Sequence, residues 1–188
     1  TERKHAQVEL KSQAITDFLT GLFNRRYFFE TAQKEFSKAL RYERPLSVII
    51  FDIDLFKNIN DNYGHDVGDQ ALAQIGDLLR NTIRNVDISA RYGGEEFIIL
   101  LPEMNCVNTE VAAERLRKKI QDTPVDVEGI LVWMTISAGV ACIDESMSMK
   151  SVDQLISKAD QALYEAKRGG RNRVCLAHEG HLVAFNAL

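Results

Sequence analysis

The sequence predicts an α+β fold in which a central, mostly antiparallel sheet is flanked by helices. Three observations support this fold class. Segments with apolar residues at helical spacing alternate along the chain with short β-branched runs. Gly93-Gly94 lies between two such runs, and this pair permits the positive φ angles of a tight hairpin. The 188 residues, 45% of them hydrophobic, suffice for one well-filled core.

The elements follow from the local pattern. Helices are expected over residues 25–42, 56–61, 108–121 and 151–167, with a further helix ending near residue 83. Strands are expected over residues 46–52, 87–92, 97–101 and 173–176, with a strand pair inside 125–140. Residues 1–16 are charged and Gln-rich and are expected to end a linking helix, residues 17–177 form the domain, and residues 178–188 are a frayed tail or an artificial extension.

Composition argues against several classes of protein. A formal net charge of −4 provides no basic field for a long nucleic acid. Cys106, Cys142 and Cys175 are odd in number and far apart in the sequence, so neither a disulfide framework nor a zinc site is expected and a reducing cytoplasm is favoured. The sequence contains no apolar run of membrane-spanning length. The chain begins with Thr1, and we expect a sensor or membrane anchor upstream in a longer protein.

Acidic residues gather at two places. Asp52 and Asp54 end the first core strand, and Glu95 and Glu96 follow the glycine pair of the hairpin. Taken singly, these acids are explained as well by solvation of a strand end or by an exposed polar turn. Together they resemble an oxygen-rich site for a hard cation, and magnesium with nucleotide phosphates is the natural occupant.

Residues 91–97, Arg-Tyr-Gly-Gly-Glu-Glu-Phe, resemble the signature of the GGDEF family of diguanylate cyclases, with Glu in place of Asp. Similar blocks follow the family order at residues 17–26, 51–61, 64–69 and 166–172. The resemblance implies the palm-like, ferredoxin-like fold of nucleotide cyclases. It also implies an enzyme that condenses two GTP into cyclic di-GMP and releases two pyrophosphates.

The resemblance further implies roles for particular residues. Asp52, the carbonyl of Ile53, Glu95 and Glu96 would hold two Mg²⁺ or Mn²⁺ ions, and Glu95, with Glu96 nearby, would accept the proton of the attacking hydroxyl. Asn60 and Asp69 would bind guanine, and His65 would contact the substrate, although a histidine before Asp66 is more often a turn or cap residue. Phosphate contacts are expected from Phe56, Lys57, Lys167 and Arg171, although cations after a helix also complement its dipole.

Two further expectations concern partners. Each domain would bind one GTP, so two chains must face each other as a homodimer. Arg84 and Asp87 occupy the position of the family's inhibitory product site, where the alternative is a weak surface ion pair. A catalytically silent module that binds GTP or cyclic di-GMP, and an ATP-using cyclase, are the competing hypotheses for function.

Overall fold

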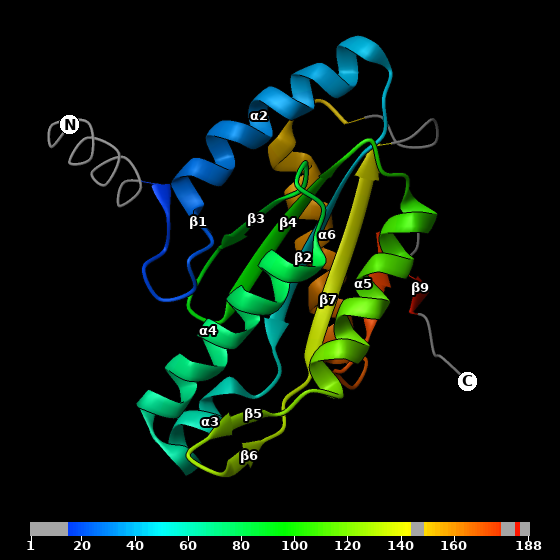
Figure 1. Ribbon diagram of the computed structural model, residues 1–188. Coiled ribbons are helices and arrows are strands. Elements are labelled where there is room, and N and C mark those ends of the chain that lie inside the picture. Colours follow the sequence, from blue (N-terminus) through cyan, green and yellow to red (C-terminus); the bar gives the residue numbers. More distant parts are fainter. Residues whose placement is uncertain (1–14, 144–148, 178–182, 185–188) are drawn as a thin grey trace, which may run out of the picture.

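The computed structural model describes residues 15–143, 149–177 and 183–184. Within them, seven strands form one mixed sheet in the order β1-β3-β4-β2-β7-β8-β9, and β5 pairs with β6 in a separate hairpin (Figure 1). The elements are β1 (Phe23–Asn24), α2 (Arg25–Tyr42), β2 (Leu46–Ile53), α3 (Phe56–Tyr63), α4 (His65–Thr82), β3 (Ile88–Arg91), β4 (Glu96–Pro102), α5 (Cys106–Gln121), β5 (Val125–Val127), β6 (Ile130–Val132), β7 (Ile136–Ile143), α6 (Val152–Arg168), β8 (Val174–Leu176) and β9 (Val183–Ala184).

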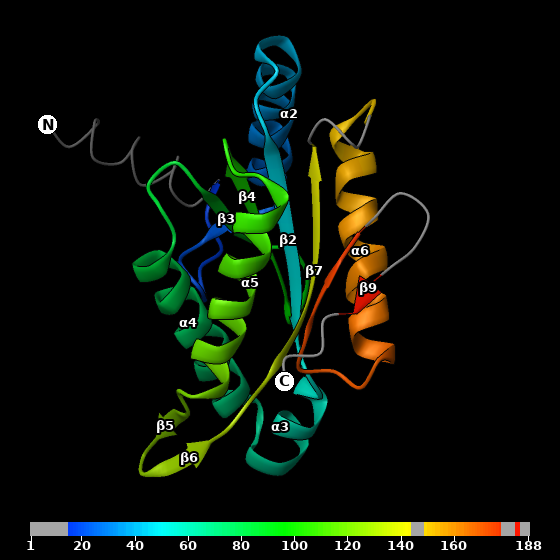
Figure 2. The same ribbon diagram turned by 90° about the vertical axis from the view of Figure 1, so that its right-hand side faces the viewer.

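The sheet separates two apolar layers. Alternate residues of β2 point to opposite faces, so Ile49 and Phe51 pack with α4 and α5 while Val48 and Ile50 pack with α2 and α6. Figure 2 shows the sheet edge-on, with α4 and α5 on one side and α6 on the other. All eight residues of β2 are buried, as expected for a central strand covered on both faces.

Polar side chains set where the helices begin. The Asn24 side chain accepts a hydrogen bond from Tyr27 N at 3.0 Å, and Asn105 does the same for Asn108 N at 3.0 Å. Ser151 caps α6 through Gln154 N at 3.3 Å. These N-caps satisfy amides that lack a partner in the first turn, which fixes the starts of α2, α5 and α6.

The predicted α+β fold is confirmed, and most pairs in the sheet are antiparallel. Two pairs are parallel, β1 with β3 and β7 with β8. The strand pair expected inside residues 125–140 is instead the small β5–β6 hairpin followed by the long strand β7. Strand β9 pairs with β8 beyond the domain boundary expected at residue 177. The linking helix expected over residues 1–16 lies almost wholly outside the described residues.

The expectation that the chain has no disulfide is wrong, because Cys106 is bonded to Cys142. Cys106 begins α5 and Cys142 lies near the end of β7, 36 residues away in sequence. The packing of α5 against β7 brings their Cα atoms to 5.6 Å, a proximity that spacing along the chain cannot show. Cys175 is free and buried. Because two of the cysteines form a disulfide, the cysteines no longer support the expectation of a reducing cytoplasm.

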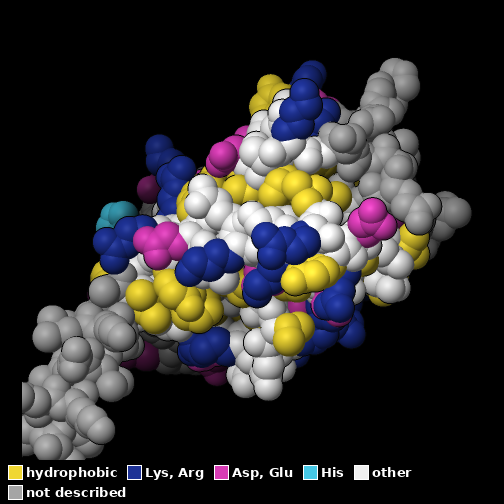
Figure 3. All heavy atoms as spheres, turned by 90° about the horizontal axis from the view of Figure 1, so that it is seen from above, with side chains coloured by type: hydrophobic (Ala, Val, Ile, Leu, Met, Phe, Trp, Pro, Cys, Tyr) yellow, Lys and Arg dark blue, Asp and Glu magenta, His cyan; other side chains and the backbone are white. Residues whose placement is uncertain are grey.

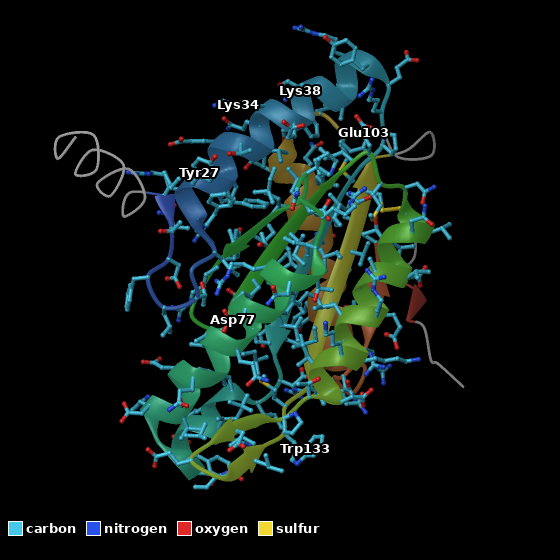
Figure 4. The ribbon with its side chains drawn as sticks, in the orientation of Figure 1. Tyr27, Lys34, Lys38, Asp77, Glu103 and Trp133 are labelled. Carbon is cyan, nitrogen blue, oxygen red and sulfur yellow. A yellow bond between two sulfur atoms is a disulfide. The ribbon has the colours of Figure 1, made fainter. Side chains whose placement is uncertain are left out.

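Basic side chains are unevenly distributed over the surface. Seen from above, the side along which α2 runs carries many lysine and arginine side chains (Figure 3). Lys34, Lys38 and Arg41 are exposed on α2, and Figure 4 labels the first two there, with Trp133 at the opposite end of the molecule. No helix within the described residues is long and apolar enough to span a bilayer.

Candidate active site

The two acidic clusters meet where β2 and β4 end side by side. Asp52 is the register partner of Glu96 across the antiparallel pair, and Ile53 N donates to the Glu95 carbonyl at 3.3 Å. Both Tyr92 N and Gly93 N donate to the Glu96 carbonyl, at 2.8 and 3.2 Å, and close the turn between β3 and β4. The hairpin therefore holds its two glutamates beside the end of the central strand.

Neither Gly93 nor Gly94 is among the described residues with a positive φ, so that expectation for the hairpin is wrong. Gly93 instead lies close to the Glu96 side chain, and an added Cβ, 2.5 Å from Oε2, would displace that carboxylate. At Gly94 a Cβ would meet no atom within 4 Å. The backbone beside the glutamates is thus open to a ligand at Gly94.

Asp52 is the most perturbed acid of the site. Burial, together with the negative charges of Glu95 and Glu96, raises the pKa of its carboxyl to about 6, against the lowering effect of Lys167. Lys167, which reaches the site from the last turn of α6, places Nζ 3.0 Å from Oδ2 of Asp52. Asp52 thus feels two further negative charges beside its one lysine partner, an excess of negative charge that a cation would neutralise.

Asp54 plays a different part from Asp52, although Asp52 lies in β2 and Asp54 follows directly after that strand. Its Oδ2 accepts from Thr135 Oγ1 at 2.7 Å and from Asn172 N at 3.0 Å, and its Oδ1 accepts from Ser137 Oγ at 2.6 Å. Asp54 is only 7% exposed. Its carboxylate therefore ties β7 and the loop after α6 to the end of β2, the structural role expected of a buried and fully bonded acid.

The residues assigned to guanine lie on α3 and α4, which form a helical hairpin around Gly64. The Asn60 side chain packs directly against Gly68 on α4, where an added Cβ would overlap its Oδ1 and press on the Phe56 ring. Only glycine at position 68 allows this approach. Asp69, the next residue, is exposed on α4, and so is His65 in the first turn. Gly64, and not His65, is the N-cap of α4.

The residues assigned to phosphates come from two elements. Lys57 is exposed in the first turn of α3, where the preceding Leu55 has a φ of 55° and makes no side-chain cap. Asn58 N donates to the Leu55 carbonyl at 2.8 Å, and no side chain caps the two amides before it. Arg171 lies in the loop that follows α6, four residues beyond Lys167, and is exposed.

Arg84 and Asp87 form a close ion pair at the opposite end of β3 from the hairpin. The Asp87 side chain, 3% exposed, accepts from Arg84 Nε at 3.0 and 3.1 Å and from the Arg84 backbone N at 2.9 Å. This ion pair raises the pKa of Arg84. Arg115 of α5 lines the same hollow of about 80 Å³, a second guanidinium that the sequence did not bring to attention.

A set of contacts unpredicted from sequence holds the hairpin tip. Arg91 donates to the Gly94 carbonyl through Nε at 3.1 Å and Nη2 at 2.8 Å, and its Nη1 lies 3.4 Å from both carboxylate oxygens of Asp17. Asp17 in turn accepts from Thr20 N at 2.9 Å and Thr20 Oγ1 at 2.8 Å. The turn before β1 and the glutamate hairpin are therefore connected through one guanidinium.

A family model described as "Diguanylate cyclase, GGDEF domain" matches residues 14–173, which is most of the chain. The chain belongs to the GGDEF family. The match covers both acidic clusters, the α3–α4 hairpin and the loop after α6. The expected family is thereby confirmed, and curated relatives at 37–40% identity are named diguanylate cyclases.

Relatives and solved structures of this GGDEF domain agree with the fold. Diguanylate cyclase A of Treponema denticola is 37% identical over 172 residues, which are 90% of this chain and 46% of that protein. The coiled coil and GGDEF domain of DgcB from Caulobacter crescentus, solved in complex with c-di-GMP, superposes with a TM-score of 0.85 at 29% identity, covering 94% of this chain and 93% of that one.

The active GGEEF domain of a diguanylate cyclase from Vibrio cholerae gives a TM-score of 0.77 at 35% identity and covers 82% of this chain and 97% of that one. Its name carries the same Glu-for-Asp signature as this domain. The chain spans less than half the length of the Treponema denticola relative.

Proposed function

We propose that this GGDEF domain condenses two GTP molecules into cyclic di-GMP and releases two pyrophosphates. The observation that carries the proposal is the meeting of Asp52 with Glu95, Glu96 and Lys167 at the end of β2. Such a site combines an acidic pocket for divalent metal with a cation for phosphate. GTP is a cytoplasmic metabolite, so the activity requires the domain to lie on the cytoplasmic side of any membrane that anchors the full-length protein.

The metal is expected to be Mg²⁺ or Mn²⁺, two ions per site, held by Asp52, the Ile53 carbonyl, Glu95 and Glu96. Within the residues that the structure describes, no three acidic, histidine or cysteine side chains form a ready metal cluster. The surplus of negative charge around Asp52 still fits a hard cation, and triphosphate oxygens would complete its ligands. The bound ions would neutralise charge on the triphosphate and acidify the attacking 3′-hydroxyl.

The chain's own residues supply the rest of the reaction. Glu95 accepts the proton of the 3′-hydroxyl. As it does so, the hydroxyl oxygen bonds to the α-phosphorus, and the bond between that phosphorus and the oxygen bridging to the β-phosphate breaks. Lys167, Arg171, Lys57 and the first amides of α3 hold the departing pyrophosphate. Asn60 and Asp69 bind the guanine edge, which presents an N1–H and an amine to a carboxylate. The same step repeated on the facing molecule closes the ring.

Two facing domains are needed because each would hold one GTP. A two-fold pairing sets each 3′-hydroxyl against the other molecule's α-phosphate, so both bonds form by in-line attack. Purified chain incubated with magnesium and GTP is therefore expected to give cyclic di-GMP, with specific activity that rises with enzyme concentration until dimers saturate.

Chromatography of the products, with ATP as the parallel substrate, tests this expectation. Product from ATP alone would favour the ATP-cyclase hypothesis, and binding of GTP without product would favour a silent module. Specific activity independent of concentration, in a chain that light scattering shows to be monomeric, would contradict the facing-dimer arrangement.

We also propose that cyclic di-GMP inhibits the enzyme at Arg84 and Asp87. The Asp87 carboxylate holds the Arg84 guanidinium in a fixed direction, and Arg115 beside it offers a second fork for a phosphate or a guanine edge. Product bound there, away from the acidic site, would hold two domains apart. Inhibition would then be noncompetitive with GTP.

Arg84→Ala or Asp87→Ala is expected to raise the product concentration for half-inhibition by on the order of tenfold, with little change in initial rate. Asn85→Ala, an exposed change in the same turn, is the matched control. Inhibition curves measured with added cyclic di-GMP check the prediction. If wild type and both variants give one curve, the contact is a structural ion pair and the feedback proposal fails.

A further inference from the structure

The loop between α6 and β8 has an unusual backbone. Arg171 and Asn172 follow each other with φ angles of 64° and 47°. Left-handed geometry costs a residue with a Cβ roughly 1 kcal/mol or more, and asparagine tolerates it better than arginine. Two such residues in succession persist only where surrounding contacts hold them, so the contacts of this loop identify what positions Arg171.

Asn172 is bonded through its backbone N–H and through both polar atoms of its side chain. Its backbone N donates to Asp54 at 3.0 Å, its Oδ1 accepts from Arg117 Nη1 at 2.5 Å, and its Nδ2 donates to Gln121 Oε1 at 3.1 Å. On either side, Arg171 N donates to the Ala166 carbonyl at 3.0 Å and Ala138 N donates to the Arg173 carbonyl at 2.9 Å. The backbone of Arg171 is thus fixed from both directions.

Arg117, the partner of Asn172 on α5, is itself held rigidly. It is 7% exposed, and its guanidinium forms a fork with Glu114 through Nε at 2.8 Å and Nη2 at 2.6 Å. That pairing lowers the pKa of Glu114 and raises the pKa of Arg117. The remaining nitrogen, Nη1, donates both to Asn172 Oδ1 and, at 2.6 Å, to Gln121 Oε1, so this buried ion pair connects α5 to the loop.

The Arg171 side chain, unlike that of Asn172, is exposed. The loop therefore keeps its asparagine bonded to the domain while its arginine remains available to a ligand. Lys167, four residues earlier, is already at the acidic site through Asp52. Both cations leave the same end of α6.

We propose that Arg117 and Asn172 are positioning residues for Arg171, and that through them helix α5 sets the affinity of the domain for the terminal phosphates of its nucleotide. This inference rests on the proposed function, which assigns Arg171 to those phosphates. Neither residue touches the nucleotide in this arrangement, and both act by holding the left-handed loop.

The test is a double-mutant cycle on nucleotide binding. Arg117→Ala, Asn172→Gly and Arg171→Ala are made singly. Each of the first two is also combined with Arg171→Ala in a double variant. Glycine at position 172 keeps both the left-handed backbone and the N–H bonded to Asp54, so that variant loses only the side-chain bonds. Lys118→Ala, which removes an exposed cation from the same turn of α5, is the matched control.

Calorimetry with magnesium measures the affinities for GTP and for GMP, which lacks the terminal phosphates. Each single variant is expected to weaken GTP binding by about tenfold and to leave GMP binding and the control unchanged. In the Arg171→Ala background, neither second change should weaken GTP binding further, because coupled residues are not additive. Circular dichroism establishes that each variant is folded, and Asn172→Gly decides the outcome if Arg117→Ala is not.

Three results would overturn the inference. Equal losses for GTP and GMP, or additive losses in the double variants, would show that the network serves the fold alone. A wild-type chain without preference for GTP over GMP would remove the phosphate role of Arg171, and the inference with it. A wild type that shows the preference and the coupling but forms no cyclic di-GMP would contradict the proposed activity and leave the positioning role intact.

Discussion

Glu95→Gln is expected to lower the rate of cyclic di-GMP formation by about a thousandfold, because it removes at once a metal ligand charge and the proposed base. The fold should not change. The backbone carbonyl of Glu95, and not its carboxylate, joins the hairpin to Ile53. Product formation from GTP and magnesium, followed by chromatography, measures the effect, and urea denaturation measures the stability.

Glu103→Gln is the matched control for Glu95→Gln. Glu103 follows the opposite end of β4, and its side chain is 61% exposed in an ion pair with Arg44. It should retain full activity. Normal synthesis by the Glu95 variant would remove this residue from the proposed mechanism.

Asp52→Asn is expected to abolish activity and, at pH 7 without metal, to make the domain more stable. Burial raises the pKa of Asp52 from 3.8 to about 6. The folded chain therefore holds this proton more tightly than the unfolded chain does. The protonated carboxyl stabilises the fold fully below pH 4, and this contribution is lost as the pH rises through 6. Above that pH the buried charge costs on the order of 1–3 kcal/mol, which asparagine avoids.

Urea denaturation of wild type and Asp52→Asn between pH 4 and pH 8 checks the direction of the stability difference and the pH range in which it develops. The two chains should converge near pH 4 and separate above pH 6. Magnesium should stabilise the wild type more than Asp52→Asn, since the variant lacks one of the proposed metal ligands. Asp61→Asn, an exposed change on α3, is the control. A variant less stable than wild type at pH 7 would show that the ion pair with Lys167 outweighs the cost of burial.

Local patterns were enough to predict most elements of the fold. Helix α2 and strand β2 agree with the predicted ranges within a residue. An amphipathic repeat with helical spacing indicates the helix, and a β-branched apolar run indicates the strand. The pairing of Asp52 with Glu96 could also be predicted from the sequence. Both acids lie at strand ends, and an antiparallel sheet readily places such ends side by side.

The features that sequence could not predict all depend on tertiary contacts. Cys106 and Cys142 meet only because α5 packs on β7. Gly93 is constrained by the neighbouring Glu96 side chain, and not by its own φ angle, so the dipeptide alone suggested the wrong reason. Arg117 belongs to no motif that was singled out, and its connection to Asn172 spans 55 residues.

The Asp17–Arg91 contact has a mechanical consequence. A guanidinium is planar and stiff, so the donors of Arg91 that hold the Gly94 carbonyl cannot turn independently of those that face Asp17. Both side chains are less than one-fifth exposed, which limits how far water can screen the link. A displacement of the turn that carries Asp17 is therefore expected to move the glutamate hairpin through the Arg91 guanidinium, alongside the β1–β3 pairing.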